Sequence, residues 1–324
     1  MTTFKEIRGT AVRSLSSDPS NPEIGQLWYN NSIGVLKGYQ SIGGAWAAGG
    51  NLGTARREFA GAGTQTAAAA FGGITTVATT ATEEYDGSAW TGGGNLNVAR
   101  RIYASAGTQT SALAFAGFIG PSDSNSTEEY DGSTWSLGGN YPEATQSSAG
   151  CGTQTAGLGF GGYANGLVKA ATYEYDGSSW TAGGNLGTAR YGLAGAGTQT
   201  VGLAISGKNV STHLANTEEY DGSAWTAGGN VSTARQLLGG AGTQTAALAF
   251  GGSAATGTTA VTEEYNGSAW TAGGSLTTAT RSLASAGTQT AGLGAGGFTT
   301  VNVANTEEYT NPTFAVQTIT TSTS

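Results

Sequence analysis

The chain has little of several residue types, and each scarcity excludes a class of protein. Of its 324 residues, one is cysteine, one is histidine and five are proline. The single cysteine, Cys151, excludes an intramolecular disulfide and any metal site that needs several cysteines. No apolar run is long enough to cross a membrane, so no membrane-spanning segment is expected. Residues 1–20 have no apolar core, so no signal peptide is expected either.

Positive charge is also scarce. Thirteen Lys and Arg residues stand against 21 Asp and Glu residues, which gives a net charge of −8. This balance argues against a nucleic-acid partner, which would need a basic face.

Glycine is abundant, with 56 residues, and such a composition can indicate disorder. The regularly spaced tryptophans argue against disorder, because a disordered chain has no core in which to bury large aromatic rings.

What the chain does have is a repeat of about 45 residues. The string Gly-Thr-Gln-Thr occurs six times, and a tryptophan stands 17 residues before each occurrence. The strings begin at Gly63, Gly107, Gly152, Gly197, Gly242 and Gly287, and the tryptophans are Trp46, Trp90, Trp135, Trp180, Trp225 and Trp270. A period of this length is typical of solenoids and propellers.

Each repeat predicts four short strands. The first holds small residues, as in 57–62, and the second is an apolar run, as in 67–71. The third reads Thr-Glu-Glu-Tyr, as in 82–85, and the fourth carries the tryptophan, with a type I′ turn at Asp86-Gly87 between them. Short strands at even spacing with one aromatic motif per unit indicate a β-propeller. A linear solenoid would need polar capping repeats, and none is visible.

The two ends of the array predict how it closes. It begins with a fourth strand, marked by Trp46, and ends with a third strand, 306–309, that no tryptophan follows. We expect the strand with Trp46 to complete the last unit, which removes an open sheet edge. The expected fold is an all-β, six-bladed β-propeller of four-stranded blades with the tryptophans packed between blades. The expected domains are a hairpin segment (1–45), the propeller (46–310) and a Thr/Ser-rich tail (311–324).

Gly72-Gly73, Tyr85 and Trp90, in this order, resemble the kelch motif. The resemblance extends over residues 46–309, with the diglycine changed to Ala116-Gly117 and Ser206-Gly207 in two repeats. It implies a fold more than a function, because such propellers serve many roles. Copper enzymes on kelch propellers need histidine ligands and a cross-linked Tyr–Cys pair. One histidine and one cysteine at an alanine position do not supply these, so no metal and no cofactor are expected.

The N-terminal flank carries a second resemblance. Gly25 to Asn30, Gly34 to Tyr39, and Trp46 are similar to a short motif of phage virion and tail-fibre proteins. Phe4 to Thr10 resembles the start of repeat-containing structural proteins of marine phages. The similarity implies a homo-oligomeric virion protein that assembles in the host cytoplasm and contacts other virion proteins through residues 1–45. The alternative is an ordinary hairpin that packs on the propeller.

Adjacent glutamates such as Glu83-Glu84 could be read as a catalytic pair. Adjacent strand residues face opposite sides of a sheet, however, and recurrence in five repeats favours a structural role. We predict that the first Glu pairs with the Arg that opens the first strand, because a buried charge needs a partner. The predicted pairs are Arg56–Glu83, Arg100–Glu128, Arg190–Glu218 and Arg235–Glu263. The third repeat lacks both charges (Thr145, Tyr173), and the sixth has Thr280 and Glu307, with Arg281 next along the chain.

Strand alternation places the loops on two faces. The turns after the first and third strands share one face, the turn face, and the remaining connections share the other, the loop face. The turns are nearly uniform, whereas the loops 74–81, 118–126, 163–171, 208–216, 253–261 and 298–305 vary. The candidate binding residues are the first position of each loop and the single histidine: Ile74, Phe118, Tyr163, Lys208, Ser253, Phe298 and His213. They could hold a sugar or a protein, or they could simply fill the mouth of the ring.

The sequence therefore predicts a non-enzymatic virion protein of the tail-fibre or decoration type, whose loop face binds a host receptor or glycan. No catalytic residue is assigned, because no repeat carries a distinctive cluster of acids. Two alternatives stay open: a glycan-cleaving enzyme that uses the same face, and a purely structural spacer without a ligand.

Overall fold

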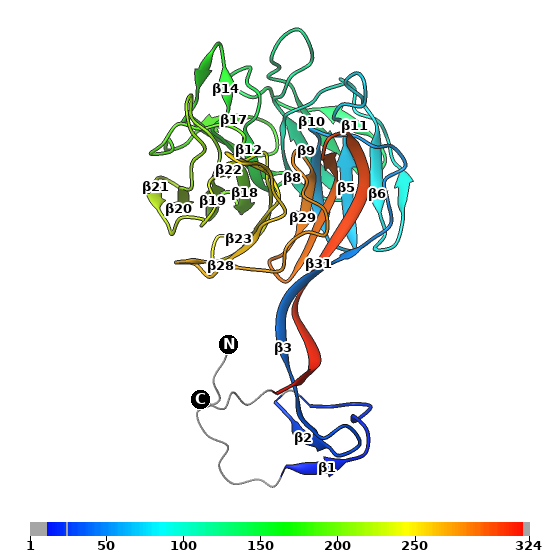
Figure 1. Cartoon of the computed structure of the whole chain (residues 1–324). Coiled ribbons are helices and arrows are strands. Elements are labelled where there is room, and N and C mark those ends of the chain that lie inside the picture. The colour runs from blue at the N-terminus through cyan, green and yellow to red at the C-terminus, as the bar shows by residue number, and fades with distance from the viewer. Residues whose placement is uncertain (1–11, 24, 320–324) are drawn as a thin grey trace. The chain divides into compact units, whose positions relative to one another are not determined.

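A computed structural model describes residues 12–23 and 25–319 of the chain. Phe4 to Thr10 and residues 320–324 of the tail lie outside the described residues. The chain divides into two compact units, with Ala45–Asn311 as unit 2 and the two flanking segments as unit 1. All regular elements among the described residues are β-strands (Figure 1). No helix in that part of the chain is long and apolar enough to cross a membrane.

Unit 2 consists mainly of four-stranded antiparallel sheets, each built by one repeat. In the first repeat the order is β4 (Ala60–Thr64), β5 (Ala67–Phe71), β6 (Thr82–Tyr85) and β7 (Trp90–Gly92). The second repeat forms β8 (Ala104–Thr108), β9 (Ser111–Phe115), β10 (Thr127–Tyr130) and β11 (Trp135–Leu137), and the third forms β12 (Ala149–Thr153), β13 (Ala156–Phe160), β16 (Thr172–Tyr175) and β17 (Trp180–Ala182). The fourth repeat forms β18 (Ala194–Gly197), β19 (Gly202–Ile205), β20 (Thr217–Tyr220) and β21 (Trp225–Ala227), and the fifth forms β23 (Gly239–Thr243), β24 (Ala246–Phe250), β27 (Thr262–Tyr265) and β28 (Trp270–Ala272).

The last repeat takes its fourth strand from the other end of the chain. Its own strands are β29 (Ala284–Gly287), β30 (Ala291–Phe298) and β31 (Asn302–Thr318). The strand beside β31 is β3 (Val35–Ala48), which carries Trp46. The backbone N–H of Gly49 donates to the Thr306 carbonyl at 2.9 Å, which continues this pairing. The strand with Trp46 therefore occupies the position expected from the sequence.

Short strands within the loops complete unit 2. The loop of the third repeat pairs β14 (Tyr163–Ala164) with β15 (Leu167–Val168). In the fifth repeat, β22 (Arg235–Gln236) pairs with β25 (Ser253–Ala254), which pairs with β26 (Gly257–Thr258).

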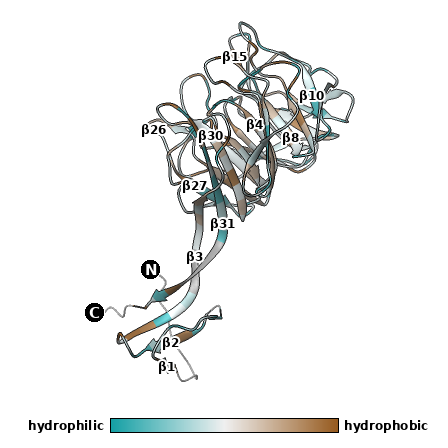
Figure 2. Cartoon of the chain, turned by 90° about the vertical axis from the view of Figure 1, so that its right-hand side faces the viewer, coloured by the Kyte–Doolittle hydropathy of each residue, from teal (hydrophilic) through white to brown (hydrophobic). Residues whose placement is uncertain are grey.

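The first strands of the six sheets contact one another in succession. β4 contacts β8, β8 contacts β12, β12 contacts β18, β18 contacts β23, β23 contacts β29, and β29 contacts β4. Their sequences are rich in Ala and Gly, and Figure 2 gives pale and brown colours to much of β4 and β8. Glycines elsewhere also allow repeats to approach closely. A Cβ atom at Gly94 would lie 1.9 Å from the Ser133 carbonyl oxygen of the next repeat, so only glycine fits there.

Aromatic side chains fill the space between neighbouring sheets. The Trp135 ring lies 4.8 Å from Phe71 in the preceding sheet and 4.9 Å from Tyr130 in its own. Its Nε1–H donates to Thr82 Oγ1 at 3.0 Å, which satisfies the indole while the ring is buried. The same bond joins each of the six repeat tryptophans to the preceding repeat: Trp46–Thr262, Trp90–Thr306, Trp135–Thr82, Trp180–Thr127, Trp225–Thr172 and Trp270–Thr217.

The glutamine of each Gly-Thr-Gln-Thr string also links two repeats. Gln109 Nε2 donates to the carbonyls of Ala68 at 3.2 Å and Tyr85 at 2.7 Å in the preceding repeat. Gln154, Gln199, Gln244 and Gln289 make the equivalent pair of bonds, and Gln65 makes it with Gly292 and Tyr309 of the last repeat. The string, which the sequence predicts only as a turn, is therefore also a cross-link.

A third link uses the second glutamate of the third strand. Tyr130 OH donates to Glu84 Oε1 of the preceding repeat at 2.5 Å, while Glu83 points toward Arg56. Adjacent glutamates thus face opposite sides, as strand alternation requires. The equivalent donors and acceptors are Tyr85–Glu308, Tyr175–Glu129, Tyr220–Glu174, Tyr265–Glu219 and Tyr309–Glu264.

These tyrosines predict a steep loss of stability at high pH. Burial, and next the hydrogen bond to Glu84, raises the pKa of Tyr130 to about 12 from its ordinary value of 10.0, and Tyr85, Tyr175, Tyr220 and Tyr265 behave alike. Because the folded state favours the neutral phenol, this stabilisation is complete below pH 10 and is lost as the pH rises through about 12. We expect cooperative unfolding in that window, followed by circular dichroism and tyrosinate absorbance. Full tyrosinate absorbance near pH 10 with the fold intact would contradict the prediction.

The turn between the third and fourth strands differs from the prediction. The sequence predicts a type I′ turn centred on Asp86-Gly87. Instead the Asp86 N–H donates to the Ala89 carbonyl, so Gly87 (φ 90°) and Ser88 are the central pair. The Asp86 carboxylate accepts bonds from the backbone N–H groups of Ser88 and Ala89, both at 2.8 Å. Asp86 therefore flanks the central pair of the turn, and its side chain stabilises the turn, because an Asp side chain can bond backbone N–H groups two residues further along the chain.

In unit 1, β2 (Leu27–Asn30) pairs antiparallel with β3 as the predicted hairpin, and β1 (Arg13–Leu15) pairs parallel with β2. The Asp18 carboxylate forms the main polar contact of unit 1. It accepts hydrogen bonds from Trp28 Nε1, Asn30 Nδ2 and Lys37 Nζ at 3.1, 3.0 and 2.6 Å. The bond from Lys37, and next that from Asn30, lowers the pKa of Asp18 to about 2. In the Trp-Tyr-Asn string, the side chains of Trp28 and Asn30 are therefore buried, and that of Tyr29 is exposed.

Candidate functional site

The six predicted loop positions lie at equivalent places on the loop face. Each forms a β-bridge with a residue that precedes the first strand of its own repeat. The bridged pairs are Ile74–Arg57, Phe118–Arg101, Tyr163–Gln146, Lys208–Tyr191, Ser253–Gln236 and Phe298–Arg281. Ser253 is buried and the other five positions are partly exposed. The bridging partners, which the sequence reasoning did not assign, therefore belong to the same surface.

Next along the chain, six equivalent residues form what we call the collar. They are Glu58, Ile102, Ser147, Gly192, Leu237 and Ser282, and their φ angles lie between 52° and 62°. The N–H of each donates to the carbonyl of the collar residue in the preceding repeat, at 2.7 to 2.9 Å, and the N–H of Glu58 donates to Ser282. A left-handed backbone is unfavourable for a β-branched residue such as Ile102, so these hydrogen bonds hold the collar in place.

The collar borders a cavity of about 170 Å³. Its walls are the collar and the residues that open the first strands of all six repeats. Glu58 is the only charged residue in this lining, and Ser147 and Ser282 add hydroxyl groups. Among the described residues, neither of these two hydroxyls has a side-chain hydrogen bond, and both residues line the cavity. The cavity therefore has a largely neutral polar wall beside the six loop positions.

Arginines from three consecutive repeats lie along one side of this surface. The guanidinium groups of Arg281 and Arg57 lie 5.0 and 4.8 Å from the centroid of the Phe298 ring. Arg57 Nε lies 3.4 Å from Glu58 Oε1, and Arg101 Nη1 lies 2.6 Å from Glu58 Oε2. Arg101 in turn covers the Phe118 ring at 5.0 Å. Arg57 also donates to Asn302 Oδ1 at 2.6 Å. We call Arg57, Arg101 and Arg281 the arginine cluster.

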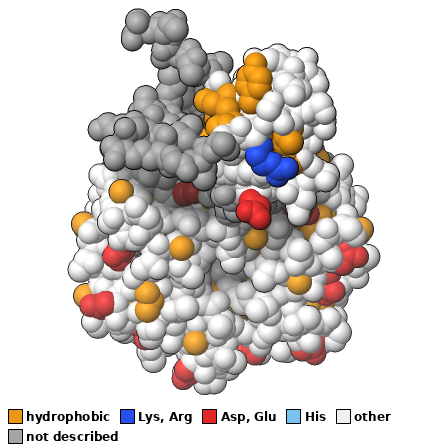
Figure 3. Space-filling model, turned by 90° about the horizontal axis from the view of Figure 1, so that it is seen from below, with side chains coloured by type: hydrophobic (Ala, Val, Ile, Leu, Met, Phe, Trp, Pro, Cys, Tyr) orange, Lys and Arg blue, Asp and Glu red, His pale blue; other side chains and the backbone are white. Residues whose placement is uncertain are grey.

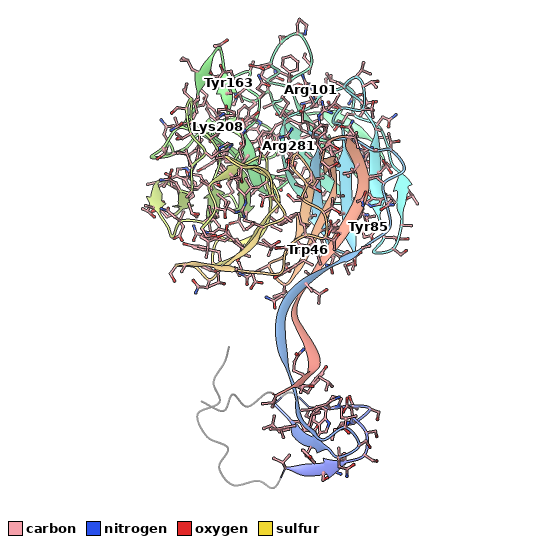
Figure 4. All side chains as sticks on the ribbon, viewed as in Figure 1. Trp46, Tyr85, Arg101, Tyr163, Lys208 and Arg281 are labelled. Atoms are coloured by element: carbon pink, nitrogen blue, oxygen red, sulfur yellow. The ribbon has the colours of Figure 1, made fainter. Side chains whose placement is uncertain are left out.

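The opposite side of the loop face carries Lys208, Tyr163 and His213. Lys208 bridges to His213, and Tyr163 lies 5.6 Å from Tyr191. Figure 4 shows Arg101, Tyr163, Lys208 and Arg281 on the upper part of unit 2, well away from Trp46 and Tyr85. Burial, and next the charge of Lys208, lowers the pKa of His213. Its Nε2 and Asp123 Oδ1, from another loop, are buried and have no hydrogen-bond partner within the described part of the chain.

The four predicted Arg–Glu pairs all form. The nitrogen–oxygen distances are 2.7 Å for Arg56–Glu83, 2.5 Å for Arg100–Glu128, 2.9 Å for Arg190–Glu218 and 2.6 Å for Arg235–Glu263. All four guanidinium groups are fully buried, and burial lowers the pKa of Arg190 to about 10. In the third repeat, Tyr173 packs edge-on against Tyr141 at 5.0 Å instead. In the sixth repeat, Glu307 accepts from the N–H groups of Thr277 and Thr278, and Arg281 lies in the arginine cluster.

Charge is divided between the two faces of unit 2. The turn face carries Asp86, Asp131, Asp176 and Asp221, all exposed, and Figure 3 shows acidic side chains around the face seen from below. The Lys and Arg residues of unit 2 outside the buried pairs are Arg57, Arg101, Lys169, Lys208 and Arg281. All five lie in the loops or in the residues bridged to them. The loop face is therefore the cationic side of an acidic molecule.

No protein-family model and no curated protein matches the chain.

Cys151, the one cysteine, is buried, and burial raises the pKa of its thiol to about 12. It therefore behaves as the small core residue that its alanine equivalents suggest. The arrangement of the loop face suits binding: a cavity, a rim of aromatic rings and a group of cations beside it.

Proposed function

We propose that unit 2 is a closed six-bladed β-propeller of the kelch-like kind, with β3 as the outer strand of the sixth blade. Support comes from the contacts between the first and last repeats, each of which reproduces a contact between neighbours. They are Trp90 to Thr306, Gln65 to Tyr309, Tyr85 to Glu308 and Glu58 to Ser282. A closed arrangement leaves no first or last sheet exposed at an edge.

We propose further that the chain is a non-enzymatic binding protein that uses its loop face. The observation that carries this proposal is the difference between the two faces. The turn face has the same chemistry in nearly every repeat, whereas the loop face brings Phe118, Tyr163, Lys208 and Phe298 to equivalent positions beside a cavity. Variation on one face of a repeat protein, with a constant scaffold beneath it, supports recognition.

The acids of the loop face favour binding over catalysis. Glycosidases need two carboxyl groups that flank the scissile bond. Glu58 is engaged by both Arg57 and Arg101, and Glu143 is paired with Lys169 at 2.6 Å. Asp123 is the one remaining carboxylate among the loop-face residues described. A hydrolytic pair would therefore need at least one carboxylate, Glu58 or Glu143, that already has a cationic partner.

For the whole chain we propose a role in a phage virion, as a tail-fibre or decoration protein. The resemblance of residues 25–46 to virion proteins supports this, and so do the exposed Tyr29 and Ile33 in unit 1, which are free for other virion proteins or a second copy. A symmetric oligomer in solution would support the role. Such a protein assembles in the host cytoplasm, and its loop face would meet a host-surface glycan or protein.

A glycan array read for both binding and released product tests the function. We expect the full chain to bind a subset of glycans or host cells without releasing product, and F118A/Y163A/F298A to lose that binding. The control L137A/V201A removes exposed apolar side chains elsewhere on unit 2 and should bind normally. Released product would identify a glycan-cleaving enzyme, and the absence of binding to glycans and to host cells would leave a structural spacer.

A further inference from the structure

The loop face has a local charge asymmetry that the fold does not require. Residues that the fold needs, such as the Trp and Gln cross-links, recur in all six repeats. The position of the arginine cluster is Arg only in the sixth, first and second repeats, which follow one another through the β29–β4 and β4–β8 contacts. In the other repeats it is Gln146, Tyr191 and Gln236. Three guanidinium groups gathered in neighbouring repeats indicate a local site.

The cluster is held in position before any ligand arrives. Phe298 carries two guanidinium groups on its ring, and Phe118 carries the third. Glu58 joins Arg57 to Arg101 through its two carboxylate oxygens. A planar cation over an aromatic ring loses part of its side-chain freedom in advance, so less entropy is lost when a ligand binds.

The cluster nevertheless keeps unused hydrogen-bond donors. Among the described residues, Arg281 has no ion pair and no side-chain hydrogen bond, and its guanidinium lies over the Phe298 ring. Arg101 uses Nη1 alone, and Arg57 uses Nε and Nη1. The side chains of Arg57 and Arg101 are 29% and 28% exposed. One carboxylate for three guanidinium groups leaves a local positive charge in a chain of net charge −8.

We propose that the arginine cluster binds the oxyanion group, a carboxylate or a sulfate, of an acidic saccharide. This proposal rests on the loop face being the glycan-binding surface. The guanidinium fork matches the two oxygens of such a group, and charge-assisted bonds of this kind are shorter and stronger than neutral ones. Arg281 makes the main contact, because none of its donors is used by the described residues, and Arg57 and Arg101, both paired with Glu58, supply further donors.

The surroundings of the cluster favour a saccharide as the carrier of the anion. The lining of the adjoining cavity includes apolar residues such as Leu193 and Leu237, and the hydroxyls of Ser147 and Ser282 in the same lining can pair with the hydroxyls of a sugar ring. An acidic protein is the rival carrier, because five loop tips expose an aliphatic side chain: Val77, Ile119, Leu167, Val210 and Val301. Those tips belong to the loops, whereas Arg57 directly precedes the collar residue Glu58, which lines the cavity. A small acidic sugar therefore fits the combination of cations and hydroxyls better than a protein segment does.

Calorimetric titration of the full chain with defined probes tests the site. The probes are an oligogalacturonate, its neutral methyl ester, a sulfated oligosaccharide and poly-glutamate. We expect binding to an acidic saccharide and none to the methyl ester, with an affinity that falls as salt is added. R281Q should weaken binding about 10-fold or more, and R281K should recover part of it because charge returns without the planar fork. K169Q, which removes a loop-face cation outside the cluster, should bind like the wild type.

The remaining outcomes separate this proposal from the proposed function. The chain could instead bind neutral glycans on the array, lose that binding in F118A/Y163A/F298A and keep it in R281Q. This result would overturn the anion site and keep the binding function. Binding of poly-glutamate alone, dependent on Arg281, would keep the cationic site and overturn the saccharide. Failure of both acidic saccharides to bind overturns the proposal, and failure of every glycan and of host cells overturns the function as well.

Discussion

Glu128→Ala is expected to lower the free energy of unfolding by about 3–5 kcal/mol, because it leaves a buried guanidinium without its counter-charge. The side chains of Arg100 and Glu128 are both fully buried, and their charged atoms lie 2.5 Å apart. The variant also removes the acceptor of the Asn97 backbone N–H. Arg100 keeps bonds to the Ala116 and Ser126 carbonyls, so the guanidinium stays in place while its charge is uncompensated. Urea unfolding followed by circular dichroism measures the loss.

The third repeat supplies the matched control. It folds with Thr145, Tyr173 and Tyr141 where the second repeat has Arg100, Glu128 and Leu96. The triple variant R100T/E128Y/L96Y copies this arrangement and should recover most of the stability, because no buried charge is left unpaired. Ser136→Ala, an exposed change in the same sheet, should stay within about 0.5 kcal/mol of the wild type. A loss below about 1 kcal/mol in Glu128→Ala would show that the ion pair is not what satisfies Arg100.

The sequence repeat was sufficient to predict the strands and their order within each sheet. The second to fourth strands of the first repeat lie where the pattern placed them, and Trp46 lies in the sheet of the last repeat. The first strand was placed at 57–62 but spans Ala60–Thr64. Arg57 is instead bridged to the loop, and Glu58 belongs to the collar. The six collar residues share no side-chain chemistry, because their role depends on the backbone, so no sequence pattern marks them.

The cross-links between repeats were missed although their signal was present. Gly-Thr-Gln-Thr is invariant in all six repeats, which a turn alone does not demand of a glutamine. The partners of Gln109, the carbonyls of Ala68 and Tyr85, are backbone groups of another repeat. Sequence alone does not specify which backbone groups face each other between repeats. The pairing of Tyr130 with Glu84 was missed for the same reason, because 46 positions separate the two residues.

For the candidate site, the sequence identified one half of the surface. The loop positions share a face, as strand alternation implied, but their partners Arg57, Arg101 and Arg281 were not assigned. The bridge from Arg57 to Ile74 depends on the register of the loop against the segment before the first strand. Loop sequences of variable composition carry little information about that register. Three arginines at one repeat position were the only available signal.

Trp135→Ala is expected to cost about 3–5 kcal/mol through the cavity that it leaves between two sheets. The ring is buried, contacts Phe71 and Tyr130, and donates to Thr82, so the variant removes packing and orphans a hydroxyl. Trp46→Ala tests the same packing in the last sheet, to which Trp46 belongs through β3. The Trp46 ring lies 4.7 Å from the Phe250 ring and 5.1 Å from the Tyr309 ring. A similar loss in both variants, measured by urea unfolding, follows if β3 is an integral strand of the last sheet. A loss near zero in Trp46→Ala alone would mean that the first and last repeats hold together without it, and the proposed closure by β3 would then be wrong.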